Sequence, residues 1–256
     1  MTAESLISSF QSGTGGGHYP RISRAELALG LNQRIADPDT MFQGTSSLCG
    51  PTSLFHCLIR DDPEAYVKYV IDLYTNGWAR VGRLEVRPGA DCRNASPTGV
   101  PPVDWVALAS LRDSDNTLFD YQSAKNEVAG ITMPHSLTDW FRAVGYSQVL
   151  NNTNVFITKG EEEILAMARL LSQGYKVCMF VNANIVQNST AGGGFFTIPN
   201  HWVELIRLQG IHNDRVTGAM LWTWQRRYSL PSPTVGQFSG NFFGYVAARG
   251  YSAPRS

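Results

Sequence analysis

The hydrophobic pattern of this chain changes its period near residue 175, and that change limits the folds open to it. Before this point apolar residues recur at helical spacing, most clearly over 161–173, which begins with three glutamates and ends before Gly174. After it come short apolar runs typical of strands, beginning with 176–182. An order in which helices come first and an antiparallel sheet follows is typical of an α+β protein.

The same patterns predict the individual elements. The expected helices cover 23–33, 49–60, 65–74, 101–110, 136–144 and 161–173, with a hairpin or an extended arm over 78–87. The expected strands cover 176–182, 201–208, 216–225 and 241–247, and Asn213-Asp214 should turn the middle pair. Residues 1–20 include a glycine-rich run with the composition of a flexible linker, so 21–256 should form a single folded domain.

Composition excludes several classes of partner. The chain has 256 residues, 43% of them hydrophobic, which is enough to bury a full core. The formal net charge is +0, so no basic surface indicates nucleic acid. No apolar run approaches the ~18 residues of a membrane span, and the first residues lack the pattern of a secretory signal. We therefore expect a cytoplasmic location, or delivery by a secretion system that needs no signal peptide.

Cys49 opens the helix expected over 49–60. Pro51 suits the first helical turn, where its missing N–H costs nothing, and Leu54 and Phe55 begin the apolar spacing. The positive end of a helix dipole favours the thiolate, which is the nucleophilic form of cysteine. His201, at the start of a predicted strand, is the candidate base, and His56 inside the Cys49 helix is a competing one.

The remaining cysteines are expected to be structural. Cys57 and Cys178 lie in apolar runs, whereas Cys92 lies in a polar stretch and should be the exposed one. No cysteine or histidine spacing indicates zinc, so we expect no metal and no cofactor, and folding without disulfides.

Two motifs carry a resemblance. Gln43-Gly44, four further residues and Cys49, together with Asn200-His201-Trp202-Val203, resemble the papain-like cysteine peptidases. The run Cys-Gly-Pro-Thr-Ser at 49–53 is most similar to the bacterial double-glycine-leader (bacteriocin-processing) peptidases, although Leu48 and Gly50 depart from the plant and lysosomal signature. The resemblance implies a papain-like α+β fold, in which a helical part carrying the nucleophile packs on a C-terminal antiparallel sheet. It also implies that Gln43 holds the oxyanion while Cys49 faces His201 across a cleft.

The third catalytic residue is less clear. The family carries Asn-Ser-Trp-Gly where this chain has Trp222-Thr223-Trp224-Gln225, so Trp222 replaces the asparagine. Strand alternation would place Thr223 and Gln225 on one face, and we rank Gln225 first for its longer reach. A Cys-His dyad with a backbone carbonyl as the orienting group is the alternative.

Three more residues are expected to line the substrate cleft. Trp202 and Trp224 lie within the motifs, and Gly193 lies in the polar, glycine-rich segment 188–194 before the histidine.

These features predict a cysteine protease that acts on a protein or peptide through an acyl-enzyme. The glycine-rich N-terminus and the missing signal also resemble bacterial toxin or effector domains, which would imply an immunity protein as inhibitor. A deamidase, a transglutaminase-like enzyme or a peptidoglycan amidase could use the same Cys-His chemistry. A non-catalytic binding protein on a degraded protease fold is the last alternative.

Overall fold

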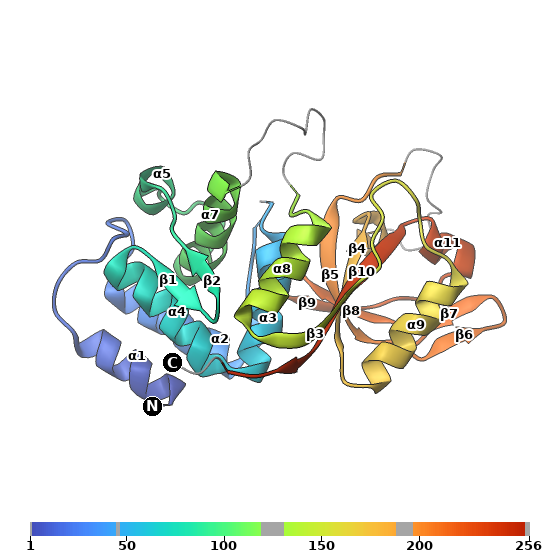
Figure 1. The fold of residues 1–256 in the computed structure, drawn as a ribbon, viewed down its shortest axis with the longest axis horizontal. Coiled ribbons are helices and arrows are strands. Elements are labelled where there is room, and N and C mark those ends of the chain that lie inside the picture. The colour runs from blue at the N-terminus through green and yellow to red at the C-terminus, as the bar shows by residue number, and fades with distance from the viewer. Residues whose placement is uncertain (1, 45–46, 119–130, 188–196, 254–256) are drawn as a thin grey trace. The chain divides into compact units, whose positions relative to one another are not determined.

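A computed structural model describes residues 2–44, 47–118, 131–187 and 197–253 (Figure 1). The chain divides into two compact units. Unit 1 comprises Met1–Thr132, Ala143–Gly145 and Tyr251–Ser256, and unit 2 comprises Met133–Arg142 and Tyr146–Gly250. Helices dominate unit 1 and a six-stranded antiparallel sheet dominates unit 2, which confirms the α+β class. The expected single domain over 21–256 is thus divided between two compact units.

Unit 1 is built from helices and one small hairpin. Its elements are α1 (Ala3–Ser12), α2 (Arg24–Ala36), the 3₁₀ turn η1 (Pro38–Thr40), α3 (Cys49–Asp61), α4 (Pro63–Asn76), β1 (Ala79–Val81), β2 (Leu84–Val86), α5 (Ala90–Asn94), α6 (Pro102–Asp104), the π-helical η2 (Trp105–Ala109) and α7 (Ser110–Leu118). Side-chain caps set several of these boundaries. Ser23 and Glu26 form a capping box at the start of α2, and Asp62 caps α4 ahead of Pro63.

Helix α1 replaces part of the expected N-terminal linker. Thr2 caps it, and its apolar positions Ala3, Ile7 and Phe10 are buried. The Phe10 ring meets that of Tyr74 on α4 edge to face, with centroids 5.4 Å apart. The linker composition therefore describes only the glycine-rich stretch after α1.

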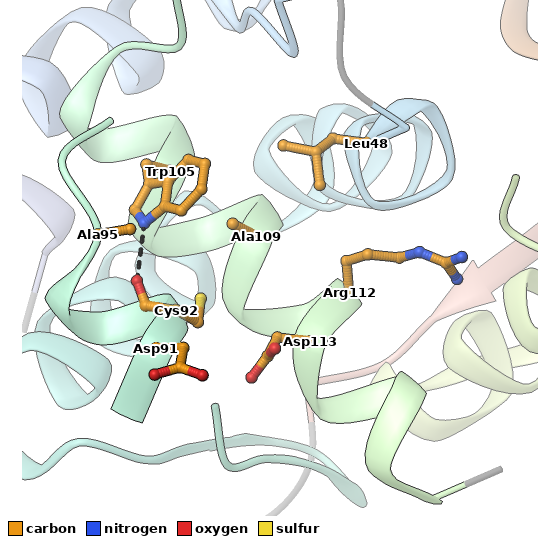
Figure 2. A pocket seen from close by; sticks show the side chains of 8 residues that line it. All are labelled: Leu48, Asp91, Cys92, Ala95, Trp105, Ala109, Arg112 and Asp113. Carbon is orange, nitrogen blue, oxygen red and sulfur yellow. Dashed lines mark hydrogen bonds between the residues drawn. The ribbon is translucent and has the colours of Figure 1, made fainter. Parts of the chain in front are cut away.

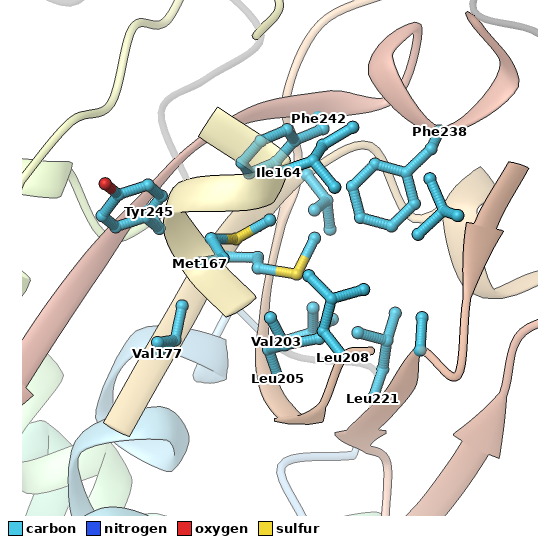
Figure 3. Packing of buried hydrophobic residues seen from close by; sticks show 14 of the residues in the cluster. Ile164, Met167, Val177, Val203, Leu205, Leu208, Leu221, Phe238, Phe242 and Tyr245 are labelled. Atoms are coloured by element: carbon cyan, nitrogen blue, oxygen red, sulfur yellow. The ribbon is translucent and has the colours of Figure 1, made fainter. Parts of the chain in front are cut away.

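Unit 2 is a sheet with helices beside it. Its elements are α8 (Pro134–Val144), which runs on into unit 1, β3 (Tyr146–Asn151), α9 (Glu161–Ser172), β4 (Lys176–Val181), α10 (Asn184–Gln187), β5 (His201–Arg207), β6 (Gly210–His212), β7 (Arg215–Thr217), β8 (Met220–Thr223), β9 (Arg226–Ser229), α11 (Val235–Ser239) and β10 (Phe242–Tyr251), whose last residue belongs to unit 1. The strand order is β3-β10-β4-β5-β8-β9. Ile164 and Met167 of α9 pack on Val203, Leu205 and other apolar side chains of the sheet (Figure 3).

The hairpin expected over 201–225 has a different internal arrangement. Asn213 and Asp214 do form a turn, at φ 48° and 58°, but it joins the short pair β6 and β7. The long partners are β5 and β8, and β8 ends at Thr223. A further strand, β9, follows a two-residue turn that the sequence did not predict. Within the described ranges, no helix combines the length and apolar character that a bilayer span requires.

Candidate active site

Cys49 is the first residue of α3, as predicted, and its side chain is buried. Among the described residues no side chain caps this helix, and its first turn holds no acidic residue to offset the dipole. The positive end of the helix therefore acts on the thiol. Gly50 is required by close packing, because a Cβ there would lie 2.3 Å from the Thr132 side chain. The start of α3 is thus fixed in unit 1 by a contact specific to glycine.

Gln43 is also in unit 1, on the segment that leads into α3. Its side chain is 3% exposed, so it belongs to the interior rather than to the surface. Gly44 follows with φ +65°, the left-handed region that favours glycine. A Cβ at Gly44 would also lie 2.6 Å from the carbonyl oxygen of Gly99. The backbone conformation and the close packing at position 44 therefore require glycine, independently of the role of Gln43.

A pocket of about 380 Å³ lies beside the start of α3 (Figure 2). Leu48, the residue before the nucleophile candidate, lines it together with Cys92, Trp105 and Asp113. The indole Nε1 of Trp105 donates to the carbonyl oxygen of Cys92 at 3.1 Å. The pocket is apolar around Leu48 and Trp105, and its charged lining residues are Asp91, Arg112 and Asp113.

The prediction that Cys92 is exposed is wrong. Cys92 lies in the short helix α5 and is buried, because α5 packs against the Trp105 side chain and α7. Burial raises the pKa of its thiol to about 12. Cys57 and Cys178 are buried as well, and none of the four cysteines, all of which lie in the described ranges, forms a disulfide. Cys49 alone among them lies at the start of a helix longer than two turns.

His201 is the first residue of β5 in unit 2 and is 4% exposed. Its Nε2 lies 2.8 Å from the hydroxyl oxygen of Thr223, the last residue of the neighbouring strand β8. Among the described residues, Nε2 makes this hydrogen bond and Nδ1 of the same ring has no hydrogen-bond partner. Burial lowers the pKa of His201 to about 4, so the imidazole of this unit is neutral at pH 7.

The indole of Trp224 covers the His201 ring. The two rings are stacked, with centroids 4.4 Å apart and planes 14° from parallel. Trp224 and Gln225 form the two-residue turn between β8 and β9, and both have positive φ, 45° and 62°. Residues other than glycine, asparagine and aspartate rarely adopt this backbone conformation, and residues with bulky side chains adopt it least often. The turn thus holds a costly backbone conformation while Trp224 stacks on the histidine.

The predicted strand alternation fails at this turn. Alternation along a continued strand predicts Trp224 on the face of Trp222, with Thr223 and Gln225 opposite, but β8 ends at Thr223 and the chain reverses. Thr223 and Trp224 therefore both meet the His201 ring. The hydrogen bond of His201 goes to Thr223, whereas the prediction ranks Gln225 first. Trp222 is buried and paired in register with Glu204.

The predicted cleft residues have different surroundings. Trp224 lies on the His201 ring, whereas Trp202 follows His201 along β5 and by alternation faces the other side of the sheet. There it is 1% exposed and stacks on Phe180, with centroids 4.6 Å apart. Gly193 and the whole 188–194 segment lie outside the described residues.

The competing base His56 has a partner of its own. It is fully buried on α3, and its Nε2 lies 2.9 Å from Asp39 Oδ1 in the segment before Gln43. This contact ties the helix of Cys49 to that segment. Among the described residues, no group of three His, Cys, Asp or Glu side chains is placed to hold a metal ion.

The structure therefore assembles two parts of the predicted site. Unit 1 holds Cys49 and Gln43, and unit 2 holds His201 with Thr223 and Trp224. The approach of Cys49 to His201 stays a prediction. Comparisons with protein-family models, with curated proteins and with solved structures returned no match.

Proposed function

We propose that this chain is a cysteine protease, in which Cys49 attacks a peptide carbonyl and His201 is the general base. The reaction follows ordinary acyl-transfer chemistry. The thiol proton passes to His201, the sulfur bonds to the carbonyl carbon, and the imidazolium returns the proton to the leaving amine. Water then hydrolyses the thioester, with His201 again accepting a proton.

The observation that carries this proposal is the environment of His201. A catalytic base needs one ring nitrogen held and the other left for the proton in transit. In the tautomer whose Nε2–H donates to Thr223 Oγ1, the lone pair is on Nδ1, which has no partner among the described residues. Thr223 then fills the orienting role for which the asparagine of the family is missing. Trp224 excludes water from one face of the ring.

The position of Cys49 supports the other half of the mechanism. The start of α3, which no described side chain caps, offers partial positive charge to a developing thiolate. Backbone N–H groups at a helix start also stabilise an oxyanion, and the Gln43 amide would be the second donor. The carboxamide has two N–H donors, one of which suffices for this role.

The test compares proteins from a cell lysate after incubation with the wild type and with Cys49→Ala. Mass spectrometry of the lysate should find new peptide termini with the wild type only. Cys57→Ala is the matched control, because it removes a thiol two turns later in the same helix and should leave cleavage intact. New deamidation sites without new peptide termini would show deamidase activity instead of protease activity. No covalent change in any protein would favour a binding protein.

A toxin or effector role is a narrower form of the same proposal. It rests on the Gly-rich N-terminal composition and on the motif resemblance alone. Expression of the wild type inside a bacterial cell should arrest growth, and Cys49→Ala should not. Normal growth of cells that contain the active protein would rule out the toxin role and would keep the protease proposal.

A further inference from the structure

A buried ion pair in unit 1 lies directly beside the segment that carries Gln43. Arg34, in the last turn of α2, is 3% exposed, and Asp104, at the end of α6, is 0% exposed. Arg34 Nε donates to Asp104 Oδ1 at 2.9 Å and Nη2 donates to Oδ2 at 2.6 Å. This two-pronged geometry fixes both side chains more tightly than a single contact would.

Both members of the pair also bind the chain just before Gln43. The backbone N–H of Phe42 donates to Asp104 Oδ2 at 2.9 Å, and Arg34 Nη1 donates to Thr40 Oγ1 at 3.1 Å. Phe42 adjoins Gln43 in sequence, so the carboxylate acts one residue from the glutamine. A buried charge that receives three hydrogen bonds is well satisfied, which is the condition for a stable interior ion pair.

Two further contacts hold the segment on its other sides. Asp39 accepts from His56 of the Cys49 helix at 2.9 Å in the tautomer that places the proton on Nε2. Gly44, on the far side of Gln43, packs so closely on Gly99 that no Cβ fits. The segment 39–44 is thus fixed to α2, to α6, to α3 and to the chain near Gly99.

We infer that the Arg34–Asp104 pair is a positioning device that fixes the Gln43 amide relative to the start of α3. A buried ion pair adds little to stability compared with apolar residues of the same volume, so its presence calls for another reason. A donor aimed at an oxyanion must be held in place before the reaction, and a displacement of about 1 Å can cost about a hundredfold in rate. The inference rests on the proposed function for the role of Gln43.

The experiment measures the position of Gln43 and its catalytic effect separately. The side-chain amide of Gln43 gives a pair of ¹H–¹⁵N signals, assigned by their loss in Gln43→Ala. Asp104→Asn removes the charge at nearly constant volume, and Thr40→Val removes one acceptor of Arg34 without changing any charge. Both variants should shift or broaden the Gln43 pair. Each should also lower kcat with little change in KM, Asp104→Asn by about tenfold or more.

A matched control comes from the same interior. Tyr66 on α4 is fully buried near Asp104, and its hydroxyl has no hydrogen-bond partner among the described residues. Tyr66→Phe should leave both the Gln43 signals and kcat unchanged. In the Gln43→Ala background, Asp104→Asn and Thr40→Val should add no further loss of kcat, because the side chain they position is gone.

Three results separate this inference from the proposed function. Unchanged Gln43 signals in folded variants would overturn the positioning role, as would additive losses of kcat in the Gln43→Ala background. If Asp104→Asn does not fold, Thr40→Val decides, since it keeps the ion pair. If the wild type hydrolyses nothing, the proposed function fails, and the amide spectra still decide whether the pair positions Gln43.

Discussion

Acidification should cost this protein stability through one buried histidine. His201 is 4% exposed, and burial lowers its pKa to about 4, against a reference of 6.5 for the unfolded chain. The folded state therefore binds this proton less readily than the unfolded state. The stability tied to the neutral ring is fully present above pH 6.5. It is lost as the pH falls toward 4, because the unfolded chain gains its proton first.

The size of the effect follows from the two pKa values. At pH 5 the unfolded histidine is almost fully protonated and the folded one almost fully neutral. The linkage relation then gives a loss of about 2 kcal/mol between pH 7 and pH 5. Below pH 4 the loss approaches about 3 kcal/mol, which is a large part of the stability of an ordinary domain.

Urea unfolding at several pH values should measure this loss, with His201→Gln as the control that lacks the titration. NMR titration of the histidine ring should give the pKa directly. A His201 pKa at or above 6.5 in the wild type would refute the argument that burial controls this pKa. If that high value then fell in Cys49→Ala, a Cys49 thiolate would be identified as the counterion, and the wild-type protein would hold a thiolate–imidazolium ion pair.

Three further predictions concern single side chains. Limiting iodoacetamide at neutral pH should modify Cys49 before the other three cysteines; earlier labelling of any other thiol would remove the assignment of the nucleophile. Thr223→Val should lower activity by about tenfold, the effect of ~1.4 kcal/mol, and Gln225→Ala should cost less; the reverse order would restore the glutamine as orienting residue. Gly50→Ala should destabilise the fold by about 1–3 kcal/mol in chemical denaturation, because its Cβ would clash with Thr132; Thr132→Ala should recover part of the loss, and a neutral Gly50→Ala would contradict the close packing.

Local signals were sufficient for much of the secondary structure. Pro51 and the apolar spacing after it placed the start of α3 at Cys49, where the structure has it. The three glutamates and Gly174 bounded α9 to within a residue or so, and the apolar run at 176–182 became β4. These elements follow from caps, turn residues and periodicity, which depend on near neighbours in the sequence.

The features that failed depend on distant residues. Trp224 and Gln225 carry none of the glycine or asparagine typical of a tight hairpin, so a continued strand was the natural prediction. Cys92 has polar neighbours in sequence, yet its burial comes from packing against Trp105, 13 residues along the chain, and against α7. The bond from Phe42 to Asp104 spans 62 positions and has no local signature. Tertiary contact decides such cases.

The hairpin turn at Trp224 and Gln225 has a consequence for redesign of the chain. A search for greater thermal stability would select asparagine and glycine here, since two side chains at positive φ cost roughly 1–3 kcal/mol each. The redesigned hairpin would fold more easily and melt later, but the histidine would lose its aromatic cover. Substitutions at this turn would then raise the thermal stability of the protein and lower its proposed activity. Under the proposed function, an aromatic residue at this position would distinguish the chains of this architecture that keep a covered histidine from those that do not.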